Sequence, residues 1–176
     1  MSRYLCAAIC QSNPTVTNCT FGGNSADKGG GMYNYDNSSP TLTNCTFSRN
    51  SADYGGGGMC SFNSAPTVAN CAFGGNSAAY CGGGMFTWDS SPTMTNCTFG
   101  GNSAANGMAV ACDSWGDPST VVMANCVLWD GRNEIGNNDG STITITYSDI
   151  QGGWPGEGCI DSDPAFVRDP DDGGDG

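Results

Sequence analysis

The feature that most constrains the fold is an internal repeat with a period of 26 residues. Prolines recur at this interval, at Pro14, Pro40, Pro66, Pro92 and Pro118. Cysteines keep the same interval at Cys19, Cys45, Cys71 and Cys97, and Cys126 follows after a short insertion. Such a period is typical of a chain that stacks one structural unit many times. The fold therefore depends on what a single unit can form.

Each unit favours short strands over helices. Every window long enough for a helix contains Gly, Pro, Asn or β-branched residues, which are poor helix formers. Hydrophobic residues make up only 38% of the chain, so amphipathic helices would have little apolar surface to bury. In the first unit, residues 15–21 and 32–35 are expected to form short strands separated by turn-forming residues.

Short strands of this kind are not stable alone in water. We therefore expect each unit to wind as one coil and to stack in parallel on the next, with equivalent residues about 4.8 Å apart. The predicted fold class is all-β, a parallel β-helix (solenoid) of about five to six coils. Residues 1–11 are expected to form a partial first coil, residues 12–150 the β-helix repeats, and residues 151–176 an acidic closing segment or linker.

Two motifs in the repeats resemble those of a known family. The runs Phe21-Gly-Gly-Asn24 and Phe47-Ser-Arg-Asn50 are each followed by a glycine run that ends in Met. They resemble the F-x-x-N and G-G-A-I repeats of polymorphic outer membrane proteins, over residues 12 to about 128, with Met where that family prefers Ile. The resemblance implies a right-handed parallel β-helix and an extracellular or cell-surface location, where such repeats form passenger or adhesin regions.

Stacked coils turn each repeated position into a row. Period-two alternation predicts that a row of Val, Leu and Met faces inward. The rest of the core is predicted to be a ladder of cysteines and phenylalanines: Cys19, Cys45, Cys71, Cys97, Cys126, Phe21, Phe47, Phe73 and Phe99. A second ladder is expected at a bend where a left-handed backbone is tolerated: Asn18, Asn44, Asn70, Asn96 and Asn125.

The cysteine ladder favours a structural role over a metal site. A straight column of thiols offers no tetrahedral cluster for zinc, and parallel Cβ vectors oppose the dihedral angle of a disulfide. The better candidates for oxidation are Cys60 with Cys81, or Cys6, Cys10 and Cys112. Because the chain has 11 cysteines, at least one thiol stays free or pairs between chains.

Two surfaces are candidates for binding. Outward threonines form a flat ladder, broken at Ala69, that resembles the ice-contacting faces of some β-helical antifreeze proteins: Thr15, Thr17, Thr41, Thr43, Thr67, Thr93 and Thr95. Strand propensity alone, or attachment of O-linked glycans, explains the same residues. If Met32, Met59 and Met85 face inward, an exposed aromatic stripe follows for lateral assembly or sugar stacking: Tyr33, Tyr35, Phe62, Phe86 and Trp88. The opposite phase, with aromatics inside, would remove this stripe.

Charge and composition exclude several function classes. The net charge of −12 disfavours nucleic acid and anionic membranes, and no apolar run reaches the length needed to span a bilayer. The chain has no His, and its acidic residues offer at most a loose group at Asp113, Asp117 and Asp130, so an enzyme is not expected. No cofactor is expected, apart from weak Ca²⁺ binding at the acidic end: Asp161, Asp163, Asp169, Asp171 and Asp172.

These observations lead to three functional hypotheses. The first is an extracellular structural protein that associates with itself into a fibre or surface stalk, with surface glycans as an open possibility. The second is an adhesin or glycan-binding module that uses the aromatic stripe or the threonines. The third is an ice-binding protein. The partners implied are other copies of the chain or a polysaccharide.

Overall fold

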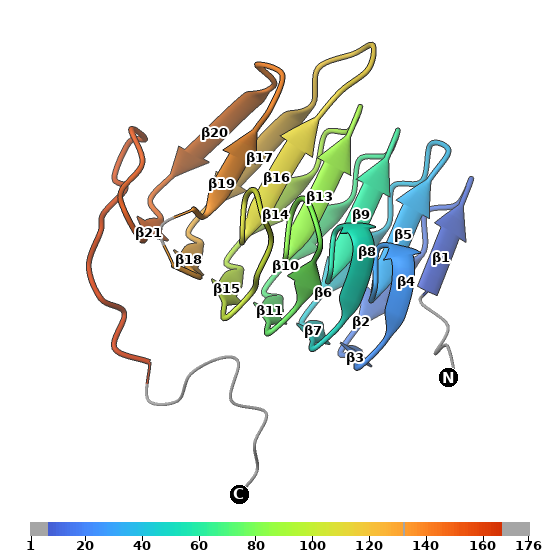
Figure 1. Cartoon of the computed structure of the whole chain (residues 1–176), viewed down its shortest axis with the longest axis horizontal. Coiled ribbons are helices and arrows are strands. Elements are labelled where there is room, and N and C mark those ends of the chain that lie inside the picture. Colours follow the sequence, from blue (N-terminus) through green and yellow to red (C-terminus); the bar gives the residue numbers. More distant parts are fainter. Residues whose placement is uncertain (1–6, 132, 167–176) are drawn as a thin grey trace, which may run out of the picture.

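The chain folds into a parallel β-solenoid of six coils, without a helix among the residues described (Figure 1). The computed structural model describes residues 7–131 and 133–166. Its strands form four parallel sheets, A to D, that run along the stack. The prediction of an all-β solenoid with about 26 residues per coil is confirmed.

Three sheets of six strands enclose the core, and a fourth has three strands. Sheet A contains β1(Ala7–Cys10), β5(Met32–Tyr35), β9(Met59–Phe62), β13(Met85–Trp88), β16(Val110–Asp113) and β19(Ile135–Asn137). Sheet B contains β2(Thr15–Thr17), β6(Thr41–Thr43), β10(Thr67–Ala69), β14(Thr93–Thr95), β17(Thr120–Ala124) and β20(Thr142–Thr146). Sheet C contains β3(Thr20–Gly22), β7(Thr46–Ser48), β11(Ala72–Gly74), β15(Thr98–Gly100), β18(Val127–Trp129) and β21(Asp149–Ile150). Sheet D contains β4(Ser25–Lys28), β8(Ser51–Gly55) and β12(Ser77–Ala78).

The predicted asparagine ladder lies at the bend between sheets B and C. All five members have a left-handed backbone with φ of 53° or 54°, which asparagine tolerates better than most residues. Their amides bond along the stack: Asn44 Nδ2 donates to Asn18 Oδ1 at 3.3 Å, and Asn96 Nδ2 donates to Asn70 Oδ1 at 3.1 Å. The bend turns the chain so that the residues after it point inward again.

The core consists of the expected rows, except at the first coil. Phe47, Phe73 and Phe99 are fully buried, and neighbouring rings stack in parallel with centroids 4.7 Å apart. The ladder cysteines Cys45, Cys71, Cys97 and Cys126 are buried as well. Cys19 is exposed and Phe21 is half-buried, because no described residue covers sheets B and C beyond the first coil, so the prediction of a core position for Cys19 is wrong.

Two ladders of buried polar residues run inside the stack and were not anticipated. Asn50 donates its backbone N–H to Asn76 Oδ1 at 3.1 Å, and Asn76 donates to Asn102 Oδ1 at 3.0 Å. The last member of this inner ladder is Asp130, whose Oδ1 accepts from Asn102 N at 2.6 Å. A row of buried serines bonds in the same way at the turn between sheets A and B: Ser38, Ser64, Ser90, Ser119 and Ser141.

The glycine runs bring each coil back from sheet D to sheet A with no room for side chains. A Cβ on Gly57 would lie 2.4 Å from the carbonyl oxygen of Ser77, and one on Gly58 would lie 2.9 Å from the ring of Phe73. The glycine three residues before each sheet A strand from β5 to β16, such as Gly56 with φ of 69° before Met59, also has a left-handed backbone. These runs are therefore close-packed parts of the coil as well as turns.

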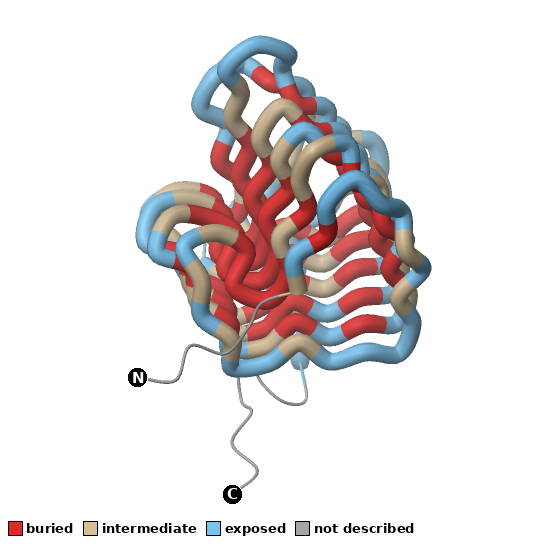
Figure 2. The backbone as a smooth tube through the Cα atoms, turned by 90° about the vertical axis from the view of Figure 1, so that its right-hand side faces the viewer, coloured by how far each residue is buried: buried red, intermediate tan, exposed pale blue. Residues whose placement is uncertain are grey.

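Sheet D adds a second layer outside sheet A, beside β5 and β9 in Figure 1. Figure 2, which looks along the stack, shows the buried residues gathered on the inner sides of the coils. Between sheets A and D lies a small separate cluster of Cys60, Phe86 and Ala111, with Tyr54 and Cys81 packed against it. Sheet A is therefore buried on both faces for part of its length.

Residues 151–166 close the far end of the stack without forming a further full coil. Ile160 bridges to Asp149, and Ile150 N donates to the carbonyl of Ile160 at 3.0 Å. Trp154 and Cys159 pack against the main core. Among the described residues, no helix has the length and apolar character needed to span a membrane.

Candidate binding surface

The aromatic residues of sheet A form a row along the stack. Tyr35, Phe62 and Trp88 pair in register on adjacent strands, and all three are half-buried. Parallel strands repeat at about 4.8 Å, so the three rings follow one another at that step. The rings of Phe62 and Trp88 lie 5.9 Å apart between centroids. The predicted inward phase of the methionines is correct, since Met32, Met59 and Met85 are buried in the main core.

The neighbouring row on the same face is covered from Cys60 onward, whereas its first aromatic member, Tyr33, is half-buried. Tyr33, Cys60, Phe86 and Ala111 pair in register, and Phe86 has no exposed surface. Sheet D lies over this row: a Cβ on Gly55 would lie 2.8 Å from Cδ1 of Phe86. The prediction that Phe86 belongs to an exposed stripe is therefore wrong, because this side chain packs under sheet D instead of facing solvent.

Sheet D supplies further aromatic residues and a cation. Tyr54, near the end of β8, packs against Trp88 with ring centroids 6.2 Å apart. The ring centroid of Tyr80 lies 5.7 Å from that of Tyr54. The Nζ atom of Lys28 lies 5.2 Å from the ring centroid of Tyr54 and 5.8 Å from that of Trp88. An ammonium held over two aromatic faces is a favourable cation–π arrangement that also fixes the position of the rings.

The loop between β16 and β17 adds the most exposed ring. Trp115 is 89% exposed, and its ring meets Trp88 edge-on at 5.5 Å. Its backbone N–H donates to Asp89 Oδ1 at 2.9 Å, which ties the loop to the preceding coil. We call the group Tyr33, Tyr35, Tyr54, Phe62, Tyr80, Trp88 and Trp115 the aromatic surface.

The electrostatics of this surface leave few groups to ionise. Burial raises the pKa values of the Tyr33 and Tyr54 phenols above their ordinary value. Burial also raises the pKa of the Cys60 thiol to about 12, so this thiol stays protonated and unreactive at neutral pH. Lys28 lies over the neutral rings of Tyr54 and Trp88. Carboxylates form a polar rim, with Asp36 beside Tyr35, Asp113 near Tyr54 and Asp89 bonded to Trp115 N.

Sequence analysis found part of this surface. It identified Tyr33, Tyr35, Phe62 and Trp88, and it missed Tyr54, Tyr80, Trp115 and Lys28. Lys28, Tyr54 and Tyr80 are themselves 26 residues apart, so the repeat carried a signal that they lie close together, although a register shift pairs Lys28 with Gly55 in sheet D. Trp115 lies in the insertion of the fifth coil, between β16 and β17, where the period of the repeat could not place it.

The threonines form a second surface, on the outer face of sheet B. The two outward rows hold twelve residues: nine threonines together with Ala69, Val122 and Ala124. The row that begins with Thr15 is exposed, and the row that begins with Thr17 becomes half-buried after the first coil. No charged residue interrupts these rows, which gives a flat, neutral face, named here the threonine face.

The structure shows no metal centre among the residues described. The ten described cysteines are unpaired, and no three His, Cys, Asp or Glu side chains in this part of the chain lie close enough to hold an ion. Asp161 and Asp163 are in the closing segment, whereas Asp169, Asp171, Asp172 and Cys6 lie outside the described residues. Weak calcium binding at the acidic end stays a prediction.

Comparison with known proteins places the chain in a fold family. No curated protein and no solved structure matches it. A family model described as "Right handed beta helix region" matches residues 2–150, which includes every coil described above. The chain therefore belongs to the family of right-handed β-helix regions.

Proposed function

We propose that this protein is an extracellular or cell-surface β-helix module that binds polysaccharide through the aromatic surface and does not catalyse a reaction. The observation that supports this most is the row of half-exposed rings at Tyr35, Phe62 and Trp88, extended by the exposed Trp115. Sugar rings stack on aromatic faces, and a row of faces along one axis suits a ligand that is itself a chain. Cell-wall and matrix polysaccharides lie outside the cell, so a role on one of these polymers requires export.

The rim and the charge balance favour a neutral polysaccharide. Hydroxyl groups of a sugar can bond to the carboxylates of Asp36, Asp89 and Asp113, whereas an anionic polymer would be repelled by them. The net charge of −12 repels acidic ligands over the whole molecule, and Lys28 is a local exception beside Tyr54 and Trp88.

The experiment is affinity electrophoresis of the purified chain in gels that contain soluble neutral β-glucan, α-glucan or galactan, with alginate as the anionic comparison. Binding to at least one neutral polymer is expected, and Trp115→Ala is expected to weaken it at least about fivefold, because one stacked ring contributes about 1 kcal/mol or more. Trp115 is almost fully exposed, so this change has little effect on folding.

The matched control is Tyr147→Asn. Tyr147 is also a largely exposed aromatic residue, and its left-handed backbone suits asparagine, but it lies at the turn after β20, outside the aromatic surface. If Tyr147→Asn weakens binding as much as Trp115→Ala, or if alginate binds more tightly than every neutral polymer, the proposal is wrong.

Self-association into a fibre or stalk is a second candidate. Its support is the first coil, where Val16 and Phe21 are half-buried and Cys19 is exposed, whereas their copies in later coils are buried. This surface suits a further coil, from the same chain or from another copy. Sedimentation velocity over a wide protein concentration tests it: concentration-dependent growth that Phe21→Asp abolishes supports axial assembly, and monomers throughout oppose it.

Ice binding through the threonine face is the remaining candidate. Its support is the flat set of nine threonines without a charged neighbour in the two rows. Thermal hysteresis that is lost on Thr41→Lys and kept on Thr46→Lys would support it, because Thr46 is equally exposed but belongs to sheet C. Absence of hysteresis in the unchanged protein would remove this candidate.

A further inference from the structure

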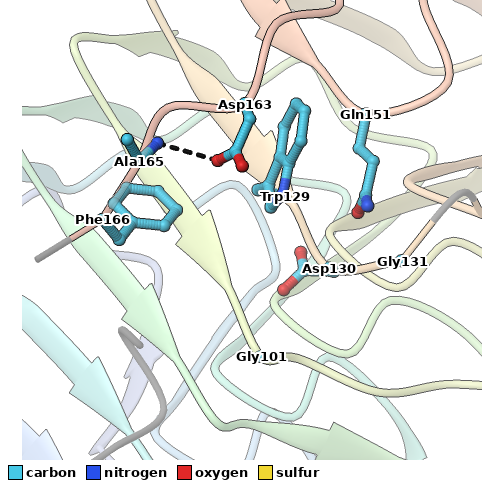
Figure 3. A pocket seen from close by; sticks show the side chains of 8 residues that line it. All are labelled: Gly101, Trp129, Asp130, Gly131, Gln151, Asp163, Ala165 and Phe166. Atoms are coloured by element: carbon cyan, nitrogen blue, oxygen red, sulfur yellow. Dashed lines mark hydrogen bonds between the residues drawn. The ribbon is translucent and has the colours of Figure 1, made fainter. Parts of the chain in front are cut away.

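A hollow of about 520 Å³ lies on the outer side of sheet C at the closing end of the stack (Figure 3). Trp129 and Asp130 come from the end of β18, Gln151 follows β21, and Asp163 and Phe166 come from the closing segment. We call this hollow the terminal pocket. Its volume is within the range of sites that bind small molecules.

The repeat explains why the ring of Trp129 has no large side chain beside it in its row on sheet C. Trp129 belongs to a row whose earlier members are small, and its partner on β15 is Gly100. On β3 and β11 the row holds Gly22 and Gly74. A second hollow of about 540 Å³ lies between Trp129 and Asp161. The indole of Trp129 is therefore bordered by open space on more than one side.

The wall of the pocket opposite sheet C is held in place by hydrogen bonds. Ser162 N donates to Asp149 Oδ1 at 3.0 Å, which fixes the closing segment to β21. Asp163 Oδ1 accepts from Ala165 N at 2.8 Å, and this bond orients the carboxylate beside the ring of Trp129 (Figure 3). Asp130, at the floor, is committed to the inner ladder through Asn102.

The lining indicates the chemistry of a ligand. Trp129 and Phe166 offer apolar faces, the amide of Gln151 offers both a donor and an acceptor, and the second oxygen of Asp163 offers an acceptor. Among the described residues that line the pocket, the charged groups are the carboxyls of Asp130 and Asp163, which disfavour phosphates and uronic acids. A neutral ligand with one apolar face and several hydroxyl groups satisfies all of these groups.

We propose that the terminal pocket binds a single neutral pyranose ring, with Trp129 stacked on the apolar face of the sugar and with Gln151 and Asp163 bonded to its hydroxyl groups. This site is separate from the aromatic surface and goes beyond the proposed function. A ligand of about a dozen heavy atoms in an open pocket binds weakly, with a dissociation constant on the order of 1 mM.

The test is an NMR titration of the full chain labelled with ¹⁵N at tryptophan. The chain has four tryptophans, so the spectrum is simple, and Trp129→Phe identifies the Trp129 indole signal. Glucose, galactose and mannose are the neutral probes, and glucuronate is the anionic one. A saturable shift of the Trp129 signal with at least one neutral sugar, and a much weaker one with glucuronate, is expected.

Two variants complete the test. Asp163→Asn keeps an acceptor for Ala165 N but replaces the free carboxylate oxygen by an amide, so sugar binding should fall at least about fivefold. Trp115→Ala should leave the titration unchanged, which separates this site from the aromatic surface. The proposal is overturned if no neutral sugar shifts the Trp129 signal up to about 100 mM, if glucuronate binds more tightly, or if Asp163→Asn binds as well as the unchanged chain.

Discussion

At the scale of single residues, asparagine has two different roles in this fold. In the outer ladder, asparagine occupies an exposed left-handed bend. In the inner ladder, each buried side-chain amide forms hydrogen bonds with backbone N–H and C=O groups of the preceding coil. Asn76 Oδ1 accepts from the backbone N–H and side-chain amide of Asn50, and Asn76 Nδ2 donates to the carbonyl of Phe47. The same residue type is therefore replaceable in one row and required in the other.

We expect Asn76→Ala to lower the free energy of unfolding by about 3 kcal/mol, because it leaves several buried donors and acceptors without partners. The control is Asn70→Gly, which keeps the left-handed bend and removes one exposed amide bond, and its expected cost is below about 1 kcal/mol. Urea denaturation of both variants measures the difference. Equal costs would show that the inner ladder does not stabilise the fold as argued.

Asp130 makes the inner ladder sensitive to pH. Burial, as the largest cause, raises the pKa of this carboxyl to about 8, well above that of an Asp in the unfolded chain. Between the two pKa values the folded state binds the extra proton, so the contribution of Asp130 to stability falls as the pH rises from about 4 to about 8. Glu134, which accepts from Asp130 N at 2.8 Å, is also raised in pKa by burial.

The matching variant is Asp130→Asn, which restores the residue type of the ladder. At pH 8, we expect the variant to unfold at a higher urea concentration than the unchanged chain, with a free energy of unfolding larger by more than about 1 kcal/mol. This difference in the free energy of unfolding is expected to shrink toward pH 4.5. A gap that stays constant between these two pH values would contradict the assigned ionisation. Urea midpoints at four pH values suffice.

At the scale of strands and turns, the glycine runs set how closely sheets A and D approach. Gly57→Ala would place a methyl group 2.4 Å and 2.5 Å from two backbone oxygens, which cannot move aside as a flexible side chain could. The expected loss is about 3 kcal/mol, at the upper end of overpacking costs, or failure to fold. Gly116→Ala is the control, since no atom lies within 4 Å of its added Cβ. Thermal unfolding followed by circular dichroism compares them.

The repeat predicted most of the strands but not the layer formed by sheet D. Sheets B and C follow from alternation, because Val68 and Phe73 point inward wherever the period places them. Sheet D consists of short polar runs such as Ser77–Ala78, which have no apolar alternation to mark them. These runs act through tertiary packing, because they cover Phe86 on sheet A. No local sequence pattern predicts the burial of Phe86. The aromatic surface was therefore found in part, and its sheet D members only from the structure.

At the scale of the whole molecule, each sheet presents a different surface along the same axis. Sheet B carries the neutral threonine face, sheets A and D together carry the aromatic surface, and sheet C carries small residues up to Trp129. Because every coil contributes one residue to each row, the length of a surface is set by the number of coils. The number of coils therefore determines both the area available to a ligand and the stability of the fold.

Removal of one complete coil tests this dependence. Deletion of residues 67–92 joins Pro66 to Thr93, which restores the Pro–Thr step found at the first four entries to sheet B and lets each row close over the gap. We expect the shortened chain to fold with the same far-ultraviolet spectrum per residue and to lose about 1–4 kcal/mol of stability, in proportion to 26 residues. It also loses Trp88, so polysaccharide binding through the aromatic surface should weaken strongly.

The control deletion removes residues 67–79, which is half a coil. It removes fewer residues, but it shifts every later row out of register, so that Phe99 and Cys97 cannot take the places of the deleted Phe73 and Cys71 on Phe47 and Cys45. If stability depended on chain length alone, this shorter deletion would be the milder one. Because stacking of like residues stabilises the solenoid, we expect the half-coil deletion to unfold the later coils. The chain with the full-coil deletion is expected to unfold in one cooperative transition. The reverse order of stability would contradict a fold built on a 26-residue coil.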